Sequence, residues 1–254
     1  MSQKTIINPS YDGLAEWIAT LPDRFDHEGE VLNDKRNVIK RWVVDGMPVV
    51  VKRFRKPSWP QRVVYTFFRK SKAERAYQYG MELRRRGFDT ACSIAYIEHR
   101  SGMLIDYCYY LCENDDAPAI EREIKNVAVP NKSLLEDFAR YAWQLHQHGI
   151  LHHDLNRSNV LYRKGDDGHY HFSLIDNNRM TFYPEGTLPP LNECMENLTR
   201  FTGDMEIFRT VAVAYCQARQ LGDDMVSQLM AVKERHDIRR KKRKAFLKKL
   251  KTRH

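Results

Sequence analysis

Apolar and polar positions alternate through most of the first 112 residues and take up a helical period later in the chain. Alternation with a period of two, broken by short polar turns, predicts β-strands. We expect three strands between Val31 and Lys52, with a turn at Asp45–Gly46, and two more at Ala91–Ile97 and Met103–Leu111. Residues 1–112 should therefore form a small antiparallel lobe of five strands.

The pattern changes at CENDDAP, residues 112–118, which we interpret as a hinge. From Ser133 onward apolar residues recur three or four positions apart until Gly149, which predicts a helix that buries one face. Further helices are expected at about 191–217 and from residue 223 onward. The expected fold class is α+β, with a β-rich lobe at residues 1–112 and a mainly helical lobe at residues 113–254.

The stretch from Ile150 to Arg179 carries three polar residues in a fixed order. Asp154 and Asn159 stand in HHDLNRSN, and Asp176 ends the apolar run HFSLID. At this spacing a carboxylate, an amide and a second carboxylate form the catalytic loop and metal site of protein-kinase-like phosphotransferases. There the first Asp orients the attacking hydroxyl, and the other two residues bind Mg²⁺. The alternative, that these residues only form caps and turns, explains each one singly but not the ordered set.

Lys52 ends the third expected strand in VVVK, where a kinase carries the lysine that pairs with nucleotide phosphates and with a helix glutamate. Glu74 is the candidate partner, and Glu82, two turns further on roughly the same helix face, is the fallback. Lys52 could instead be an ordinary strand-end lysine, and Ser71 with Glu74 could be a capping box whose glutamate bonds only the helix start. The turn at residues 33–37 lacks the glycines of a phosphate-covering loop, so backbone amides and a basic side chain of this turn would have to bind the phosphates.

The net charge of +9 comes largely from the C-terminus. Residues 239–254 hold ten Lys and Arg and no acid, and without them 32 basic residues face 33 acidic ones. Such a segment indicates a polyanionic neighbour, namely an anionic membrane surface, a phosphorylated glycolipid or nucleic acid. Phe246, Leu247 and Leu250 group on one side of the last expected helix, so this end could lie against lipid or could be a solvated tail.

Residues 53–86 interleave basic side chains with aromatic ones, among them Trp59, Phe67 and Phe68. Such a segment could contact lipid headgroups or an anionic glycan. Alternatively, it could pack its aromatic face on the small lobe and leave its arginines in solvent.

The sequence gives no sign of secretion or of a membrane-spanning segment. No apolar run approaches the roughly 20 residues that span a bilayer, and MSQKTIINPSYDG contains no signal-peptide core. Five cysteines, without a C-x-x-C pair, predict free thiols in a reducing compartment.

The motifs together resemble the bacterial lipopolysaccharide core kinases, the Kdo and heptose kinases that share a two-lobed protein-kinase-like fold. The resemblance runs from about Val31 to Phe201 and rests on VVVK, KAERAY, ILHHDLNRSNVL and SLID. It implies an enzyme that uses ATP and Mg²⁺ to phosphorylate a Kdo or heptose hydroxyl of the lipid A–core precursor. By position it implies that Asp154, Lys52 and Glu74 act in catalysis. It also implies that the nucleotide is bound by Lys52, Asn159 and Asp176, and that the metal ligands are Asn159 and Asp176.

The same resemblance implies a cytoplasmic enzyme at the inner face of the inner membrane, where the basic tail would meet anionic lipid. Nucleic acid is not favoured as a partner, and no obligate protein partner is inferred. His153 replaces the arginine that reads activation-loop phosphate in protein kinases, so switching by that route is not expected.

Two other functions compete with this interpretation. One is another active kinase of the same fold, either RIO-type, whose basic tail would meet RNA, or a small-metabolite kinase. The other is a pseudokinase that binds an anionic glycolipid without turnover, which the glycine-free turn favours and the set of Lys52, Asp154, Asn159 and Asp176 opposes. Nucleotide binding without phosphate transfer would indicate the pseudokinase.

Overall fold

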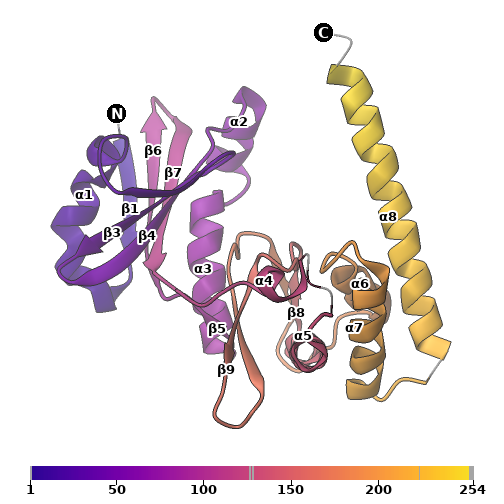
Figure 1. Cartoon of the computed structure of the whole chain (residues 1–254). Coiled ribbons are helices and arrows are strands. Elements are labelled where there is room, and N and C mark those ends of the chain that lie inside the picture. The colour runs from indigo at the N-terminus through magenta and orange to yellow at the C-terminus, as the bar shows by residue number, and fades with distance from the viewer. Residues whose placement is uncertain (1, 126, 128, 223, 252–254) are drawn as a thin grey trace. The chain divides into compact units, whose positions relative to one another are not determined.

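The structure of the chain is a computed structural model that describes residues 2–125, 127, 129–222 and 224–251. The chain forms two compact units (Figure 1). The first comprises Met1–Asp116 and Leu174–Arg179, and the second comprises Ala117–Ser173 and Met180–His254. Residues 174–179 are therefore part of the first unit, although they lie far along the chain from its other residues.

A six-stranded antiparallel sheet forms most of the first unit. In spatial order its strands are β1 (Ser2–Ile7), β6 (Ser93–Ser101), β7 (Leu104–Glu113), β4 (Met47–Phe54), β3 (Val38–Val44) and β2 (Glu30–Asp34). The prediction of five strands is one short, because it omits β1, which pairs with β6 at the edge of the sheet. The β1 sequence SQKTII is mostly exposed and polar at its start, so no apolar alternation marks it as a strand.

Helices pack on both faces of this sheet and determine which way each β4 side chain points. The helices of the unit are η1 (Pro9–Leu14), α1 (Ala15–Arg24), α2 (Trp59–Phe67) and α3 (Lys72–Arg85). Val51 of β4 is buried in one core with Phe25, which follows α1. Phe54 is buried in a second core with residues of α3. Because side chains alternate along a strand, Lys52 shares the α3 face with Phe54, and Arg53 shares the α1 face with Val51.

The second unit is mainly helical, as the sequence predicts. Its elements are α4 (Glu121–Ile124), α5 (Lys132–Gln147), β8 (Ile150–His152), β9 (Val160–Lys164), β10 (Tyr170–Leu174), β11 (Met180–Phe182), α6 (Leu191–Leu198), α7 (Met205–Ala218) and α8 (Asp224–Lys251). The helix expected from Ser133 is α5. The Asn131 side chain caps it by accepting from the backbone N–H of Leu134 at 3.1 Å. At its centre Phe138 stacks on Phe201, with ring centroids 4.0 Å apart, and α5 leads through Gly149 into β8.

The last helix, α8, begins within the unit and ends as a basic segment with exposed side chains. Leu229 and Lys233 are fully buried, whereas side chains 238–249 are all exposed. The predicted group of Phe246, Leu247 and Leu250 falls in this part, and the side chain of Leu250 lies outside the described residues. Within the described ranges, no helix combines the length and apolar character needed to cross a membrane. All five cysteines are unpaired, as their spacing predicts.

Candidate active site

The loop between β8 and β9 holds Asp154 and Asn159 in one hydrogen-bonded turn. The Asn159 amide donates to the backbone oxygen of Asp154 at 3.0 Å. The Asn156 amide donates to Oδ1 of Asp154, also at 3.0 Å, and its own oxygen accepts from the backbone N–H of Ser158 at 2.9 Å. Two predicted site residues are therefore brought together, and Asn156 restrains the carboxylate at the centre of the loop.

A chain of buried hydrogen bonds connects this loop to α5, α6 and α7. The backbone N–H of Asp154 donates to Nδ1 of His152 at 3.1 Å, and Asn197 of α6 donates to the His152 backbone oxygen at 2.8 Å. That bond turns the Asn197 oxygen toward His146 of α5, whose Nε2 lies 3.1 Å from it. Tyr215 of α7 lies 2.8 Å from the other ring nitrogen of His146. We infer that His146 donates to Asn197 and accepts from Tyr215, which requires the neutral ring.

Burial lowers the pKa of His146 to about 4, Arg219 adds to this effect and the bond to Asn197 opposes it. The ring is therefore neutral at pH 7, as the hydrogen bonds require. Sequence reasoning missed His146 and Asn197. The signal that could have found them is a polar residue at an otherwise apolar position of a helix, because both side chains are buried.

His153 stands immediately before Asp154 and contacts a hydroxyl of a neighbouring strand. Its Nε2 lies 2.8 Å from Oγ1 of Thr181 on β11, the strand that pairs with β8. Burial and then the charge of Arg200 lower the pKa of His153, so the ring is mostly neutral at pH 7. A neutral imidazole bound to a hydroxyl gives no fixed positive charge for a phosphorylated loop.

In the first unit, Lys52 and Asp176 form an ion pair of 2.7 Å between side chains that are 12% and 31% exposed. Asp176 has a φ of +61°, a left-handed conformation that is uncommon outside glycine and collects at functional sites. The Asn178 amide donates to the same carboxylate oxygen. Thr90 fixes the preceding backbone by donating to the oxygen of Leu174 at 2.7 Å. The segment thus holds a carboxylate beside the strand lysine.

The expected pair of Lys52 with Glu74 is not formed among the described residues. Glu74 lies 3.8 Å from Lys4 of β1 and accepts from Gln78 at 3.1 Å, while its backbone N–H donates to Oγ of Ser71 at 3.1 Å. The capping interaction is therefore present on its Ser71 side. The prediction failed because β1 was not foreseen, and β1 supplies the cation that Glu74 meets.

The turn between β2 and β3 stands where a phosphate-covering loop is expected, and it contains no glycine. Lys35 and Arg36 at its tip are exposed. The Asn37 side chain accepts from the backbone N–H of Arg55 at 3.1 Å, which ties the turn to the chain after β4. The turn is therefore anchored by a side chain and carries two cations.

Comparison with known proteins supports the family suggested by the motifs. The model of the lipopolysaccharide kinase (Kdo/WaaP) family matches residues 61–182, which include Asp154, Asn159 and Asp176. A solved structure, "WaaP in complex with acyl carrier protein", is similar with a TM-score of 0.62 at 17% identity, and the match covers 92% of this chain and 97% of that chain. This similarity confirms the protein-kinase-like fold. No curated protein matches the chain.

Proposed function

We propose that the chain is an ATP-dependent kinase of the lipopolysaccharide core, because the model of the lipopolysaccharide kinase (Kdo/WaaP) family matches residues 61–182. The acceptor in this proposal is a Kdo or heptose hydroxyl of the lipid A–core precursor. The observation that carries it is the 2.7 Å ion pair between Lys52 and Asp176. These residues lie 124 positions apart in the sequence. Their pairing supports the assignment of Lys52 to the phosphates and of Asp176 to the metal.

Asp154 is the base in this mechanism. Its carboxylate accepts or orients the proton of the sugar hydroxyl while the hydroxyl oxygen attacks the terminal phosphorus of ATP. The bond from Asn156 restricts rotation of this carboxylate, and the chain of hydrogen bonds through His152 restrains its backbone. Such restraint favours transfer, because phosphoryl transfer depends mainly on positioning and electrostatics.

Lys52, Asp176 and Asn159 serve the nucleotide. The Lys52 ammonium offsets negative charge on the phosphates, and its low exposure strengthens that effect. The carboxylate of Asp176 and the amide oxygen of Asn159 are the hard oxygen donors that Mg²⁺ prefers, so these two residues fit the proposed metal. When bound, Mg²⁺ would neutralise charge that develops on the transferred group. Glu74 is left out of this mechanism because it pairs with Lys4.

The deciding experiment is a transfer assay read by mass spectrometry. Purified protein, ATP and Mg²⁺ are incubated with Kdo-lipid A or with a longer core acceptor, and Asp154→Ala is the control. The proposal expects a gain of one phosphate on one acceptor, and no gain with the variant. ATP binding without transfer to either acceptor would contradict the proposed acceptor class.

The non-catalytic binder remains the second candidate, because one observation favours it. The turn at residues 35–37 has no glycine through which the backbone could approach the phosphates closely. On this alternative the protein binds an anionic glycolipid and transfers nothing. Glycolipid binding that persists in Asp154→Ala, with no phosphate gained in the wild type, would establish it.

The proposed location is the inner face of the inner membrane, at an anionic lipid surface. The exposed basic end of α8 supports it, as do the aromatic side chains around α2. Trp59, Phe67 and Phe68 are 69%, 56% and 82% exposed, so they do not pack on the sheet as the alternative interpretation required. The similar WaaP structure contains an acyl carrier protein, so a carrier protein is a second candidate partner, which co-purification would test.

A further inference from the structure

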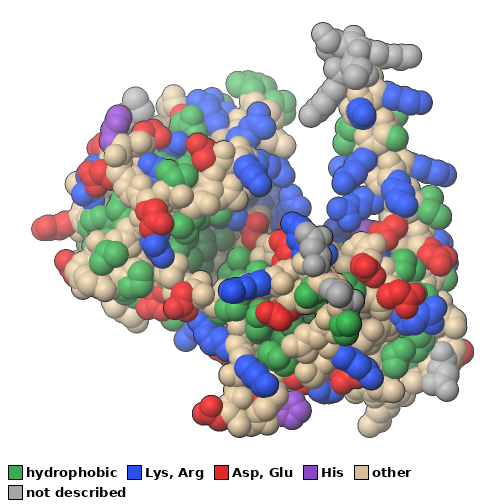
Figure 2. Space-filling view, viewed as in Figure 1, with side chains coloured by type: hydrophobic (Ala, Val, Ile, Leu, Met, Phe, Trp, Pro, Cys, Tyr) green, Lys and Arg blue, Asp and Glu red, His purple; other side chains and the backbone are tan. Residues whose placement is uncertain are grey.

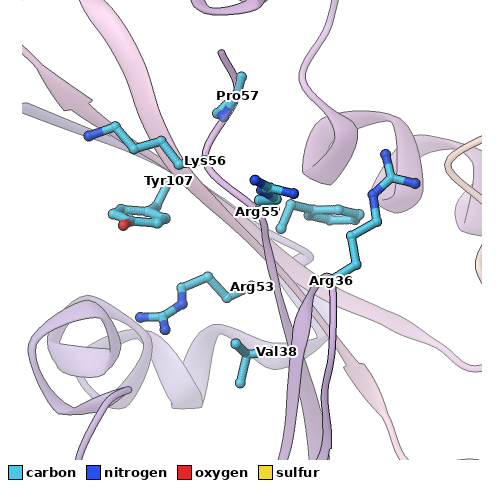
Figure 3. A pocket seen from close by; sticks show the side chains of 8 residues that line it. Arg36, Val38, Arg53, Arg55, Lys56, Pro57 and Tyr107 are labelled. Atoms are coloured by element: carbon cyan, nitrogen blue, oxygen red, sulfur yellow. The ribbon is translucent and has the colours of Figure 1, made fainter. Parts of the chain in front are cut away.

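Two adjoining hollows in the first unit are lined by cations and by no carboxylate. The larger, of about 500 Å³, is lined by Arg36, Arg53, Arg55 and Lys56 together with neutral side chains. The smaller, of about 300 Å³, shares all of these cations except Arg53 and adds Lys72. Figure 3 shows the side chains of the larger hollow around the chain that follows β4. We call the two together the basic hollow.

Only some of these cations have a counter-charge. Arg53 pairs with Asp26 at 2.8 Å, and Lys56 pairs with Asp106. Arg36, Arg55 and Lys72 form no ion pair with a carboxylate among the described residues. Three positive charges therefore line one concave surface without internal compensation, which favours a bound anion.

Lys72 shows how strongly positive this surface is. It is the first residue of α3, and the N-terminal end of the helix dipole adds further positive potential. Burial, and then the charge of Arg36, lower the pKa of Lys72, and Arg179 and Arg75 add to the effect. A ligand that brings two or more negative charges would relieve the repulsion between these like positive charges.

The larger hollow is lined from both faces of β4, by Phe54 on the face of Lys52 and by Arg53 on the other face. Arg53 leaves β4 on the α1 face, where its guanidinium lies 4.4 Å from the Phe25 ring. Lys52 leaves the same strand on the opposite face and bonds Asp176. The larger hollow therefore extends onto the face of the sheet that does not carry the proposed nucleotide lysine.

We propose that the basic hollow binds a phosphate or carboxylate group of the acceptor, apart from the phosphates of ATP. This inference rests on the proposed function and adds how an anionic glycolipid is recognised. Arg36 and Arg55 can each present two N–H groups to one oxyanion, and Lys72 adds a point charge. The hydrogen bond from Arg55 to Asn37 holds the two arginine segments together.

The test compares the combined variant Arg55→Gln, Lys72→Gln, which leaves the turn that carries Arg36 intact, with a matched charge-loss control. The control is Arg41→Gln, Arg85→Gln, which removes two cations of the same unit that already bond Glu30 and Glu82. Binding of inorganic pyrophosphate is measured by calorimetry, and the KM values for acceptor and for ATP are measured separately. The single variant Arg55→Gln serves if the combined one does not fold.

We expect the combined variant to lose at least about tenfold in pyrophosphate affinity and to raise the acceptor KM by a similar factor, with the KM for ATP within about threefold of wild type. The control should change neither. A KM for ATP that rises as much as the acceptor KM would assign the hollow to the nucleotide and overturn the inference, as would an unchanged acceptor KM. If the wild type transfers no phosphate but the variant alone loses pyrophosphate, the proposed function fails and the anion site stands.

Discussion

At the scale of single residues, the most informative contact is the one between Lys52 and Asp176. Each side chain is the other's counter-charge at 2.7 Å, and both belong to the first unit. A half-buried ion pair contributes little to stability because desolvation offsets attraction. We therefore expect its value to lie in phosphate binding, and expect its loss to affect turnover more than folding.

Lys52→Met should lower kcat/KM for ATP by about 100-fold or more, because a preorganised charge at the phosphates is removed. Asp176→Asn should lower kcat/KM to a similar extent. The double variant should lose far less kcat/KM than the product of the two single losses, since the residues act as a unit. The measurement is steady-state phosphate transfer at varied ATP. Lys132→Met is the matched control, because Lys132 is 79% exposed and, among the described residues, forms an ion pair only with Glu136 across one helical turn. Additive losses would show that Lys52 and Asp176 act independently.

Gly29 gives a stability prediction at the same scale. It has a φ of +81°, and a Cβ placed there would lie within 3 Å of three atoms of the Trp42 ring. Gly29→Ala should therefore destabilise the protein by about 2–4 kcal/mol, from left-handed strain and from overpacking. Urea denaturation measures this change.

Two other glycines separate these causes. Gly46 has a φ of +80° with nothing within 4 Å of its Cβ position, so Gly46→Ala should show the strain alone, about 1 kcal/mol. Gly13 has the same open space without a positive φ, so Gly13→Ala should be near neutral. Equal losses at Gly29 and Gly46 would show that the Trp42 ring yields without penalty.

At the scale of elements, the sequence predicts what depends on local pattern and fails where distant segments meet. Helix α5 follows from the spacing of apolar residues between Ser133 and Gly149, and the order of Asp154, Asn159 and Asp176 follows from a motif. The partner of Glu74 does not follow in this way. It depends on Lys4, which reaches Glu74 only because β1 pairs with β6 more than 90 residues later in the sequence. Similarly, no local pattern connects His146 with Asn197.

The packing of α5 against α6 and α7 leads to a prediction about pH. The pKa of His146 falls from 6.5 to about 4 on folding, so between these values the unfolded chain binds a proton that the folded protein excludes. Stability is therefore full above pH 6.5 and decreases as the pH falls toward 4. His146 alone should make the protein about 2 kcal/mol less stable at pH 5 than at pH 8.

The test is His146→Gln, which can still donate to Asn197 and accept from Tyr215 but does not titrate. Its free energy of unfolding, measured at pH 8 and at pH 5, should fall less than that of the wild type. The pKa of His153 is lowered as well, and its contribution is common to both proteins and cancels. His27→Gln, at an exposed position, is the control and should lose as much free energy of unfolding between pH 8 and pH 5 as the wild type. If His146→Gln loses as much free energy of unfolding between pH 8 and pH 5 as the wild type, His146 does not stay neutral on folding.

At the scale of the whole molecule, charge is concentrated rather than spread. Ten of the 42 Lys and Arg residues lie in the last 16 positions, and the described part of that segment is an exposed helix. Figure 2 shows blue side chains along α8 as far as it is described. Folding does not require so many like charges side by side, because they repel one another on a helix surface. Their grouping is instead suited to an anionic surface, where each basic residue contributes about 1 kcal/mol and the contributions add.

Deletion of residues 239–254 should therefore abolish most binding to vesicles of anionic phospholipid, and binding by the full chain should weaken steeply as salt is raised. The measurement is co-sedimentation with phosphatidylglycerol vesicles, using phosphatidylcholine vesicles as the uncharged reference.

Phe246→Ser with Leu247→Ser distinguishes insertion of the apolar side into lipid from binding by charge alone, since these side chains are 62% and 48% exposed. If the apolar side enters the lipid, this double variant binds more weakly at high salt, where charge attraction is screened; if charge alone acts, it matches the wild type. Phe67→Ser with Phe68→Ser applies the same test to the aromatic residues at the end of α2. Vesicle binding that survives the deletion but is lost in this last variant would move the membrane contact from the tail to the first unit.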